Sequence, residues 1–508
     1  MHSPRRRSRF TRLVAATAVG TALVVGAPLA ANAATTYPSD SAKPDLVSLL
    51  GGYNGFWTPS GTNDLHGTVK DAATLSLNDQ LAVWINNNAT PAQQFKALQD
   101  AEYNNATNTA YDQSLTIADS LGSALAPLYV KGTETGALPL TTALINSSNG
   151  TSGSYVSTGT AKATFSYPRP YLPTDPTTPA VAGDAAACAP TTVNASSTSA
   201  DRVGKSYADA QGNLAINRVA PVTDTTNVYS PNDVTLDAGY GTVGICTGGS
   251  FPSGHTTTAY QAGVTLATLL PELAPEILTR ASEAGNDRIV LGVHYPLDIV
   301  GGRIDGEAAL AARWSDAAYR TQVLEPARAE LVNYLTAQCG GTLTSCIAKE
   351  TAYSSNPYGG AAMPGGTAQI VTNRASAVSV YKERLTYGFP QISATNLAAS
   401  VPTGASNLLL TAFPTLTDAQ RTAVLAQTEI ASGYPLDQSG TANGSWQRLN
   451  LAAATSATVQ LAADGSVQVT ATGGQATVLA AAVTAPAPVS VTPAAPAATK
   501  PHLPVVSG

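Results

Sequence analysis

Four apolar segments punctuated by prolines, between residues 255 and 337, constrain the fold of this chain most. The first segment runs from 255 to 270 and stops at Pro271, and each of the other three begins at a proline. Proline is favoured at the first position of a helix, because the N–H that it lacks has no partner there. We therefore predict helices over 255–270, over 275–284, from 296 toward 314, and over 326–337.

Helical spacing also marks residues 75–128, where apolar side chains such as Leu81 and Ile85 recur on one face. We interpret this segment as plain core packing. Two shorter helices are predicted further along the chain, over 374–385 and 417–431. The predicted fold class is therefore mainly α.

The C-terminal part has a different pattern. From 453 the apolar residues alternate, which predicts a small β hairpin with its turn at Asp464-Gly465. From 480 onward the chain consists mostly of Ala, Pro and Val, and this composition is typical of a flexible tail.

The N-terminus has the pattern of an export signal. Five arginines precede residue 13, an apolar run spans 13–30, and small residues follow to Ala33. This pattern predicts a secretory signal peptide over residues 1–33, cleaved after Ala33, and a secreted, extracellular protein. The alternative is a membrane anchor, but the run is short for a span and contains Gly20, Gly26 and Pro28.

The composition excludes several classes of partner. The formal net charge is −6, and removal of the arginine-rich signal makes the mature chain more acidic. An acidic protein is a poor general binder of nucleic acid or of anionic membranes. No later segment has about 18 uninterrupted apolar residues, so we expect no membrane span and a soluble mature protein. The length allows one large domain with an appendage.

The chain has four cysteines, which suggests two disulfides in an exported protein. Three pairings are open. Cys339 with Cys346 closes most easily, because two glycines lie between them, and Cys188 would then pair with Cys246 across a Pro/Gly/Ser-rich excursion at about 171–250. The cysteine and histidine spacing does not suit zinc, so no metal site is predicted.

Two of the five histidines fall in one short segment with an arginine and an aspartate. His255 follows a Pro-Ser-Gly sequence, and His294 lies between Arg288 and Asp298. Phosphoryl transfer needs cations for the non-bridging oxygens, a nucleophile, and an acid for the leaving oxygen. This segment offers each of these groups.

The candidate anion-binding groups come from three places. Lys162 and Arg169 are seven residues apart, and prolines flank the arginine. Ser253-Gly254 stands where a helix N-cap belongs, and Arg288 is the third cation. Each group has a simpler explanation when taken alone, either as surface charge or as an ordinary helix cap.

The two imidazoles have distinct predicted roles. His294 is the candidate nucleophile, because Asp298, four residues later, can accept a hydrogen bond from its ring and fix its tautomer. His255 is the candidate acid. The alternatives are that Asp298 only stabilises a helix terminus and that His255 is a core histidine with satisfied hydrogen bonds.

The order Lys-x6-Arg-Pro, Pro-Ser-Gly-His and Arg-x5-His-x3-Asp over residues 162–298 resembles the three-part motif of the type 2 phosphatidic acid phosphatase superfamily. This superfamily includes bacterial class A nonspecific acid phosphatases and the vanadium haloperoxidases. The resemblance implies a helical bundle of the acid phosphatase/vanadium haloperoxidase type. Expected parts are a catalytic domain over 34–345 with the insertion, a helical extension over 346–455 packed on it, and the hairpin and tail over 456–508.

The resemblance also implies a role for each motif residue. His294 attacks phosphorus, Asp298 orients His294, and His255 protonates the leaving alcohol. The phosphate oxygens are bound by five groups: Lys162, Arg169, Ser253, Gly254 and Arg288. No metal or other cofactor is implied, and the expected partners are small-molecule phosphate esters.

The chain departs from the family pattern at two places. Asp287 stands where the family usually has serine, and this acid either disturbs a phosphate contact or points away from the site. The insertion at about 171–250 is longer than usual and could form a lid or a substrate rim.

The leading hypothesis is a secreted phosphatase that cleaves phosphomonoesters through a phosphohistidine. The alternative is a vanadate-dependent haloperoxidase, for which vanadate would be a cofactor rather than an inhibitor. A soluble lipid phosphatase and a non-catalytic envelope or binding protein with a degenerate site are further alternatives. The sequence leaves the natural substrate, the pH optimum, the oligomeric state and the function of the tail open.

Overall fold

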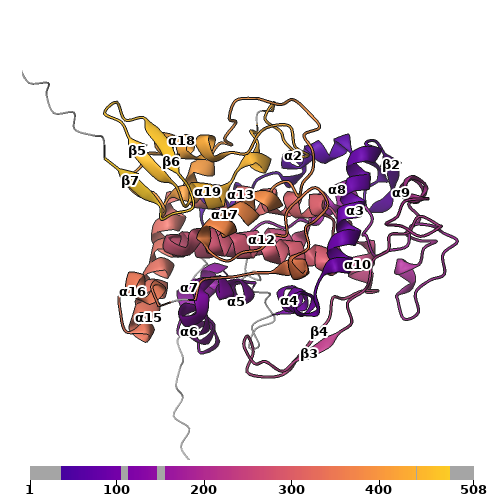
Figure 1. Cartoon of the computed structure of the whole chain (residues 1–508), viewed down its shortest axis with the longest axis horizontal. Helices are drawn as coiled ribbons and strands as arrows, with labels where there is room; N and C mark the ends of the chain where they lie inside the picture. Colours follow the sequence, from indigo (N-terminus) through magenta and orange to yellow (C-terminus); the bar gives the residue numbers. More distant parts are fainter. Residues whose placement is uncertain (1–35, 104–112, 146–154, 350, 442, 481–508) are drawn as a thin grey trace, which may run out of the picture. The chain divides into compact units, whose positions relative to one another are not determined.

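Three consecutive helices form the centre of the fold: α11 (Gly254–Leu269), α12 (Ala274–Val290) and α13 (Pro296–Ser315). The computed structural model describes residues 36–103, 113–145, 155–349, 351–441 and 443–480. α12 is buried at every residue and packs against both α11 and α13. Figure 1 labels α12 and α13. A helix buried on all sides needs partners for its polar groups, and neighbouring helices provide some of them, such as Asp100 for Arg280.

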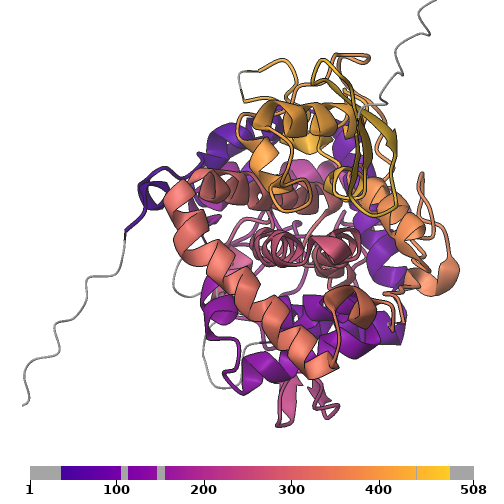
Figure 2. The ribbon, with the colours of Figure 1, turned by 90° about the vertical axis from the view of Figure 1, so that its left-hand side faces the viewer.

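Other helices surround this centre (Figure 2). α3 (Ala72–Asn88), α4 (Pro91–Glu102) and α17 (Arg374–Arg384) contact α12 directly. α6 (Gly122–Glu134) and α7 (Pro139–Ile145) pack against α15 (Glu325–Cys339). The remaining α-helices are short: α1 (Pro38–Ser41), α2 (Leu46–Leu49), α5 (Ser114–Ile117), α8 (Gly159–Phe165), α9 (Ser196–Arg202), α10 (Val243–Thr247), α14 (Ala317–Tyr319), α16 (Leu343–Ile347), α18 (Asp418–Thr428) and α19 (Leu451–Ala454).

The prediction of a mainly α fold is confirmed, and most predicted helices agree with the structure within about three residues at each end. α12 is the exception, because the helix predicted to end at Ala284 continues to Val290. The residues after Ala284 include Gly285, a poor helix former. Burial explains the difference. A Cβ on Gly285 would lie 2.9 Å from Thr256 Cγ2 and 3.0 Å from Ile299 Cγ2, so glycine lets α12 pack closely against both neighbours.

The strands are few and peripheral. β1 (Trp57–Gly61) and β2 (Asp64–Val69) pair antiparallel, as do β3 (Val222–Asp224) and β4 (Val234–Leu236). The predicted hairpin is β5 (Thr458–Leu461) with β6 (Val467–Ala471), turning at Asp464-Gly465. A third strand, β7 (Thr477–Leu479), pairs parallel with β5 and was not predicted, because three residues carry no periodicity.

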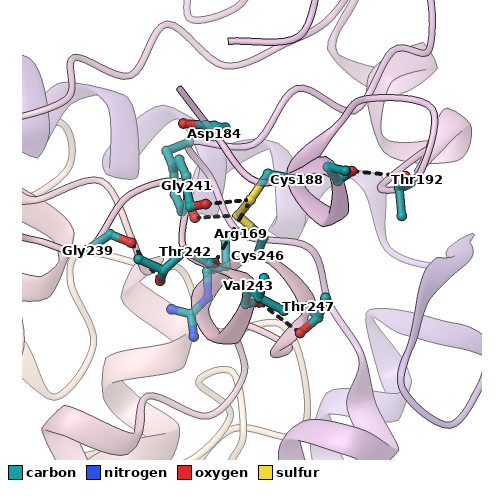
Figure 3. The surroundings of a disulfide bond; sticks show 12 residues. Arg169, Asp184, Cys188, Thr192, Gly239, Gly241, Thr242, Val243, Cys246 and Thr247 are labelled. Atoms are coloured by element: carbon teal, nitrogen blue, oxygen red, sulfur yellow. Dashed lines mark hydrogen bonds between the residues drawn. A yellow bond between two sulfur atoms is a disulfide. The ribbon is translucent and has the colours of Figure 1, made fainter. Parts of the chain in front are cut away.

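Both predicted disulfides are present. Cys188 bonds to Cys246 with a Cα–Cα distance of 5.0 Å, and Cys339 bonds to Cys346 with 6.1 Å. The first disulfide holds the start of the 171–250 insertion against α10 (Figure 3). The predicted signal peptide at 1–33 and the tail beyond 480 lie outside the described residues. Among those that are described, no helix has the length and apolar character needed to cross a bilayer.

Candidate active site

The candidate residues lie on four helices and in two of the loops next to them. Lys162 lies on α8, and Arg169 lies in the loop that follows. Ser253, Gly254 and His255 start α11, and Arg288 lies in the last turn of α12. His294 lies in the loop before α13, and Asp298 lies in the first turn of that helix.

His294 is held from both sides of its ring. Nδ1 lies 3.0 Å from Asp298 Oδ2, and Nε2 lies 3.1 Å from Arg169 Nη1. The Tyr295 backbone N–H donates to the same carboxylate oxygen over 2.9 Å. Because the carboxylate accepts a proton at Nδ1, the lone pair of the ring lies on Nε2, which faces the guanidinium. The lone pair that a nitrogen nucleophile would use is therefore on Nε2, in contact with Arg169 Nη1.

Backbone carbonyls anchor Lys162 and Arg169. Lys162 Nζ donates to the carbonyl oxygens of Gly249 (2.9 Å) and Ser250 (3.2 Å). Arg169 donates to the carbonyl oxygens of Gly248 (3.2 Å) and Val293 (3.0 Å). Within the described residues, neither side chain forms a salt bridge with a carboxylate, so an anion bound there would have no carboxylate competing for these donors.

The disulfide of the insertion lies beside this anchor. Cys246 is on α10, and Arg169 donates to the carbonyl of Gly248, two residues after it. Figure 3 shows Arg169 next to the disulfide. The covalent bond to Cys188 therefore restrains the backbone that holds the arginine.

Ser253 acts as the N-cap of α11. Its Oγ accepts from the Thr256 N–H over 3.2 Å, and its own N–H donates to the Asp298 carbonyl over 3.0 Å. The second bond joins the start of α11 to the start of α13. At the next residue, Gly254, an added Cβ would lie 3.0 Å from Thr158 Oγ1, a tight contact, so glycine lets the start of α11 lie close to Thr158.

Burial and like charges change the proton affinities of the cluster. Burial, reinforced by Arg288 and Arg169, lowers the pKa of His255 well below its usual value. Burial, reinforced by Arg169, likewise lowers the pKa of His294. Burial also lowers the pKa of Lys162 and raises that of Asp298 to about 7. Cations gathered around two neutral imidazoles favour a bound anion.

Sequence reasoning missed the contact that orients His255. The His255 ring forms a hydrogen bond with the backbone of Ala101, in the last turn of α4. This bond raises the pKa of His255, whereas burial lowers it. The two residues are 154 positions apart, and no local motif signals their contact.

Asp287 lies in a separate cluster next to α4. Burial, followed by the charges of Asp100 and Glu283, raises the pKa of Asp287 well above its usual value. Asp100 itself is bound by Arg280 with N–O distances of 2.6 and 2.8 Å. The acid that replaces the usual serine therefore belongs to a buried network of carboxylates and points away from the cations of the site.

Residues 140–322 match the sequence profile of the PAP2 superfamily. This segment is therefore similar to the PAP2 superfamily. It contains all eight candidate residues, from Lys162 to Asp298. The family resemblance predicted from the motifs is thus confirmed.

Proteins similar to this chain support the same relationship. An acid phosphatase of Zymomonas mobilis is 42% identical over 83 residues, which is 16% of this chain and 31% of that protein. A non-specific acid phosphatase of Providencia stuartii is 34% identical over 75 residues, 15% of this chain and 30% of that protein. One of Salmonella typhi is 36% identical over 63 residues, 12% of this chain and 25% of that protein. The chain therefore spans less than a third of the length of these relatives.

Proposed function

We propose that the PAP2 domain hydrolyses phosphomonoesters through a phosphohistidine formed on His294. The observation that carries this proposal is the position of the His294 ring between the Asp298 carboxylate at Nδ1 and the Arg169 guanidinium at Nε2. The names of the similar proteins, all acid phosphatases, support the same reaction class.

In the first step, the three cations Lys162, Arg169 and Arg288 bind the non-bridging oxygens of the ester. The backbone N–H groups at the start of α11 add to this binding, because a helix N-terminus favours an anion. Nε2 of His294 attacks phosphorus, the P–O bond to the alcohol breaks, and His255 gives its proton to the departing oxygen.

In the second step, water attacks the phosphohistidine. The new P–O bond forms as the P–Nε2 bond breaks, and His255 takes the proton that the water loses. Asp298 stabilises the ring while it carries positive charge. Charge stabilisation throughout comes from fixed side chains, and the prediction that no metal or cofactor is required rests on them.

We also propose that the protein is exported, with residues 1–33 as the signal peptide. The two disulfides support export, because disulfides persist in oxidising compartments. Vanadate-dependent halide oxidation in the same pocket is the less favoured function, since the similar proteins are named as phosphatases.

The direct test uses the purified protein in two assays. We expect hydrolysis of p-nitrophenyl phosphate, inhibited by vanadate. We expect no oxidation of bromide when vanadate and peroxide are supplied. Halide oxidation without ester cleavage would reverse the ranking of the two functions.

A second prediction concerns the pH dependence of anion binding. A dianion in the site raises the pKa of His255 and His294, so binding takes up protons and affinity must rise as pH falls. Protonation of Lys162 and Asp298 changes the charge in the same direction. We expect sulfate, which does not titrate in this range, to bind about tenfold more tightly at about pH 5 than at about pH 8.

Calorimetry in buffers of different ionisation enthalpy measures both the affinity and the protons taken up. The His255→Ala variant should take up fewer protons than the native protein. An affinity that stays constant or rises with pH would contradict the lowered histidine pKa values.

A further inference from the structure

One face of α3 contacts the segment that carries His294. The contact begins at the end of α12 and continues into the first turn of α13. Its residues are buried polar side chains on a helix that the apolar pattern alone identified as core.

Before His294, the contact is made by Asn86, which is 1% exposed. Its Nδ2 donates to the Val290 carbonyl over 2.7 Å and to the Asn217 carbonyl over 2.9 Å. Its Oδ1 accepts from the Asn217 N–H over 2.7 Å. Val290 ends α12, so its carbonyl has no partner inside the helix, and Asn86 supplies one. Because the nitrogen and the oxygen of the amide both form hydrogen bonds, the orientation of the amide is fixed.

The insertion holds the two residues that follow Val290. The Tyr240 hydroxyl donates to the Leu291 carbonyl. Ile216 packs against Gly292, where φ is +67° and an added Cβ would lie 2.3 Å from Ile216 Cγ2. The insertion therefore contacts the His294 loop at both of these residues.

After His294, α3 makes two more contacts. Asn78 Oδ1 accepts from the Leu297 N–H over 3.0 Å. Asp79 binds Arg202 with N–O distances of 2.8 and 2.9 Å, and Arg202 donates to the Tyr295 hydroxyl over 3.1 Å. The loop is thus held by α3 on both sides of the imidazole.

We infer that Asn86 is a positioning residue for His294, acting through Val290 and joining α3, the insertion and the end of α12 in one set of hydrogen bonds. The role of His294 in this inference rests on the proposed function. Asn86 does not touch the reacting atoms; its effect is on the geometry of the loop.

The geometry makes the loop sensitive to small shifts. Arg169 Nη1 contacts the Val293 carbonyl and His294 Nε2 together, at 3.0 and 3.1 Å. A displacement of Val293 would therefore move the nucleophile relative to a cation that binds the substrate. A shift of about 1 Å can lower a rate by about 10²-fold.

The chain offers a matched control in the next residue. Asn87 is exposed, accepts from the Asn217 side chain (2.7 Å) and donates to the Ala215 carbonyl (3.1 Å). Among the described residues, both hydrogen-bond partners of its side chain lie in the same segment of the insertion, and Val290 is not one of them. Asn87→Ala therefore loosens the insertion without removing the bond to the end of α12.

The test compares Asn86→Ala, Asn86→Asp and Asn87→Ala in the full chain. Asn86→Asp keeps the size of the side chain but removes both donors, so it separates hydrogen bonding from packing. With p-nitrophenyl phosphate, we expect kcat to fall by about 10- to 100-fold in both Asn86 variants, while KM changes by less than about threefold. Asn87→Ala should stay within about twofold of the native kcat. Each kcat is calculated per folded protein, and near-ultraviolet circular dichroism measures the folded fraction of each variant.

Hydrogen exchange gives a readout that does not depend on activity. The amides of 291–294 should exchange faster in the Asn86 variants than in Asn87→Ala. The inference is overturned if the Asn86 variants match Asn87→Ala in kcat and in exchange. If the native protein lacks phosphatase activity, the proposed function fails on its own, and the exchange comparison still decides whether Asn86 holds the loop.

Discussion

His294→Ala is expected to lower kcat for p-nitrophenyl phosphate by about 10⁴-fold or more, because the side chain that forms the covalent intermediate is gone. The neighbouring groups cannot replace it. Asp298 loses its partner at Nδ1, and Arg169 is a cation that cannot attack phosphorus. Steady-state assays with ³²P-labelled ester, quenched during turnover, would also show acid-labile label on the native protein and none on the variant.

His66→Ala is the matched control for this experiment. His66 is a partly exposed histidine that pairs with Asp64, near the β1–β2 hairpin, and it belongs to none of the three motifs. Its replacement should leave kcat within about twofold, because surface substitutions have small effects. If His294→Ala kept more than about a tenth of the native rate, another group would have to form the intermediate, and the assignment of the nucleophile would be wrong.

The central helices and the candidate site could be predicted because their signals are local. Prolines marked the first turns of α12, α13 and α15, and the four-residue spacing places His294 just before α13 and Asp298 in its first turn. A hydrogen bond between such neighbours needs no knowledge of the rest of the fold. The disulfide Cys339–Cys346 was equally local, since it closes a loop of sequence separation 7.

The hydrogen bonds that hold the site in place could not be predicted, because they join distant parts of the chain. Asn86 reaches Val290 over a sequence separation of 204 and Asn217 over 131. Buried asparagines on a largely apolar helix follow no pattern that distinguishes them from surface residues. The same holds for Asp287, whose place among carboxylates depends on how α4 packs against α12. Tertiary packing decides such contacts, and a single sequence does not record it.

His255→Ala is expected to slow the reaction by an amount that depends on the leaving group. An alkyl phosphate needs a proton on the departing oxygen, so its kcat should fall by about 10²- to 10⁴-fold. p-Nitrophenolate leaves without a proton, and its ester should lose much less. Burial and Arg288 lower the pKa of His255 in the free site, and a bound dianion raises it again, so the ring gains the proton that it donates. The measurement is kcat for a series of esters graded by the pKa of the alcohol.

Lys162→Ala separates this acid role from a general loss of binding. Lys162 lies at the start of the site, anchored by the Gly249 and Ser250 carbonyls, and its proposed contacts are with non-bridging oxygens. Its loss should lower kcat/KM by a similar factor for every ester in the series. A steeper dependence on the alcohol pKa in His255→Ala, with an unchanged slope in Lys162→Ala, would assign the proton to His255. Parallel slopes in both variants would remove His255 from that role, since a ring that merely shapes the pocket cannot distinguish one leaving oxygen from another.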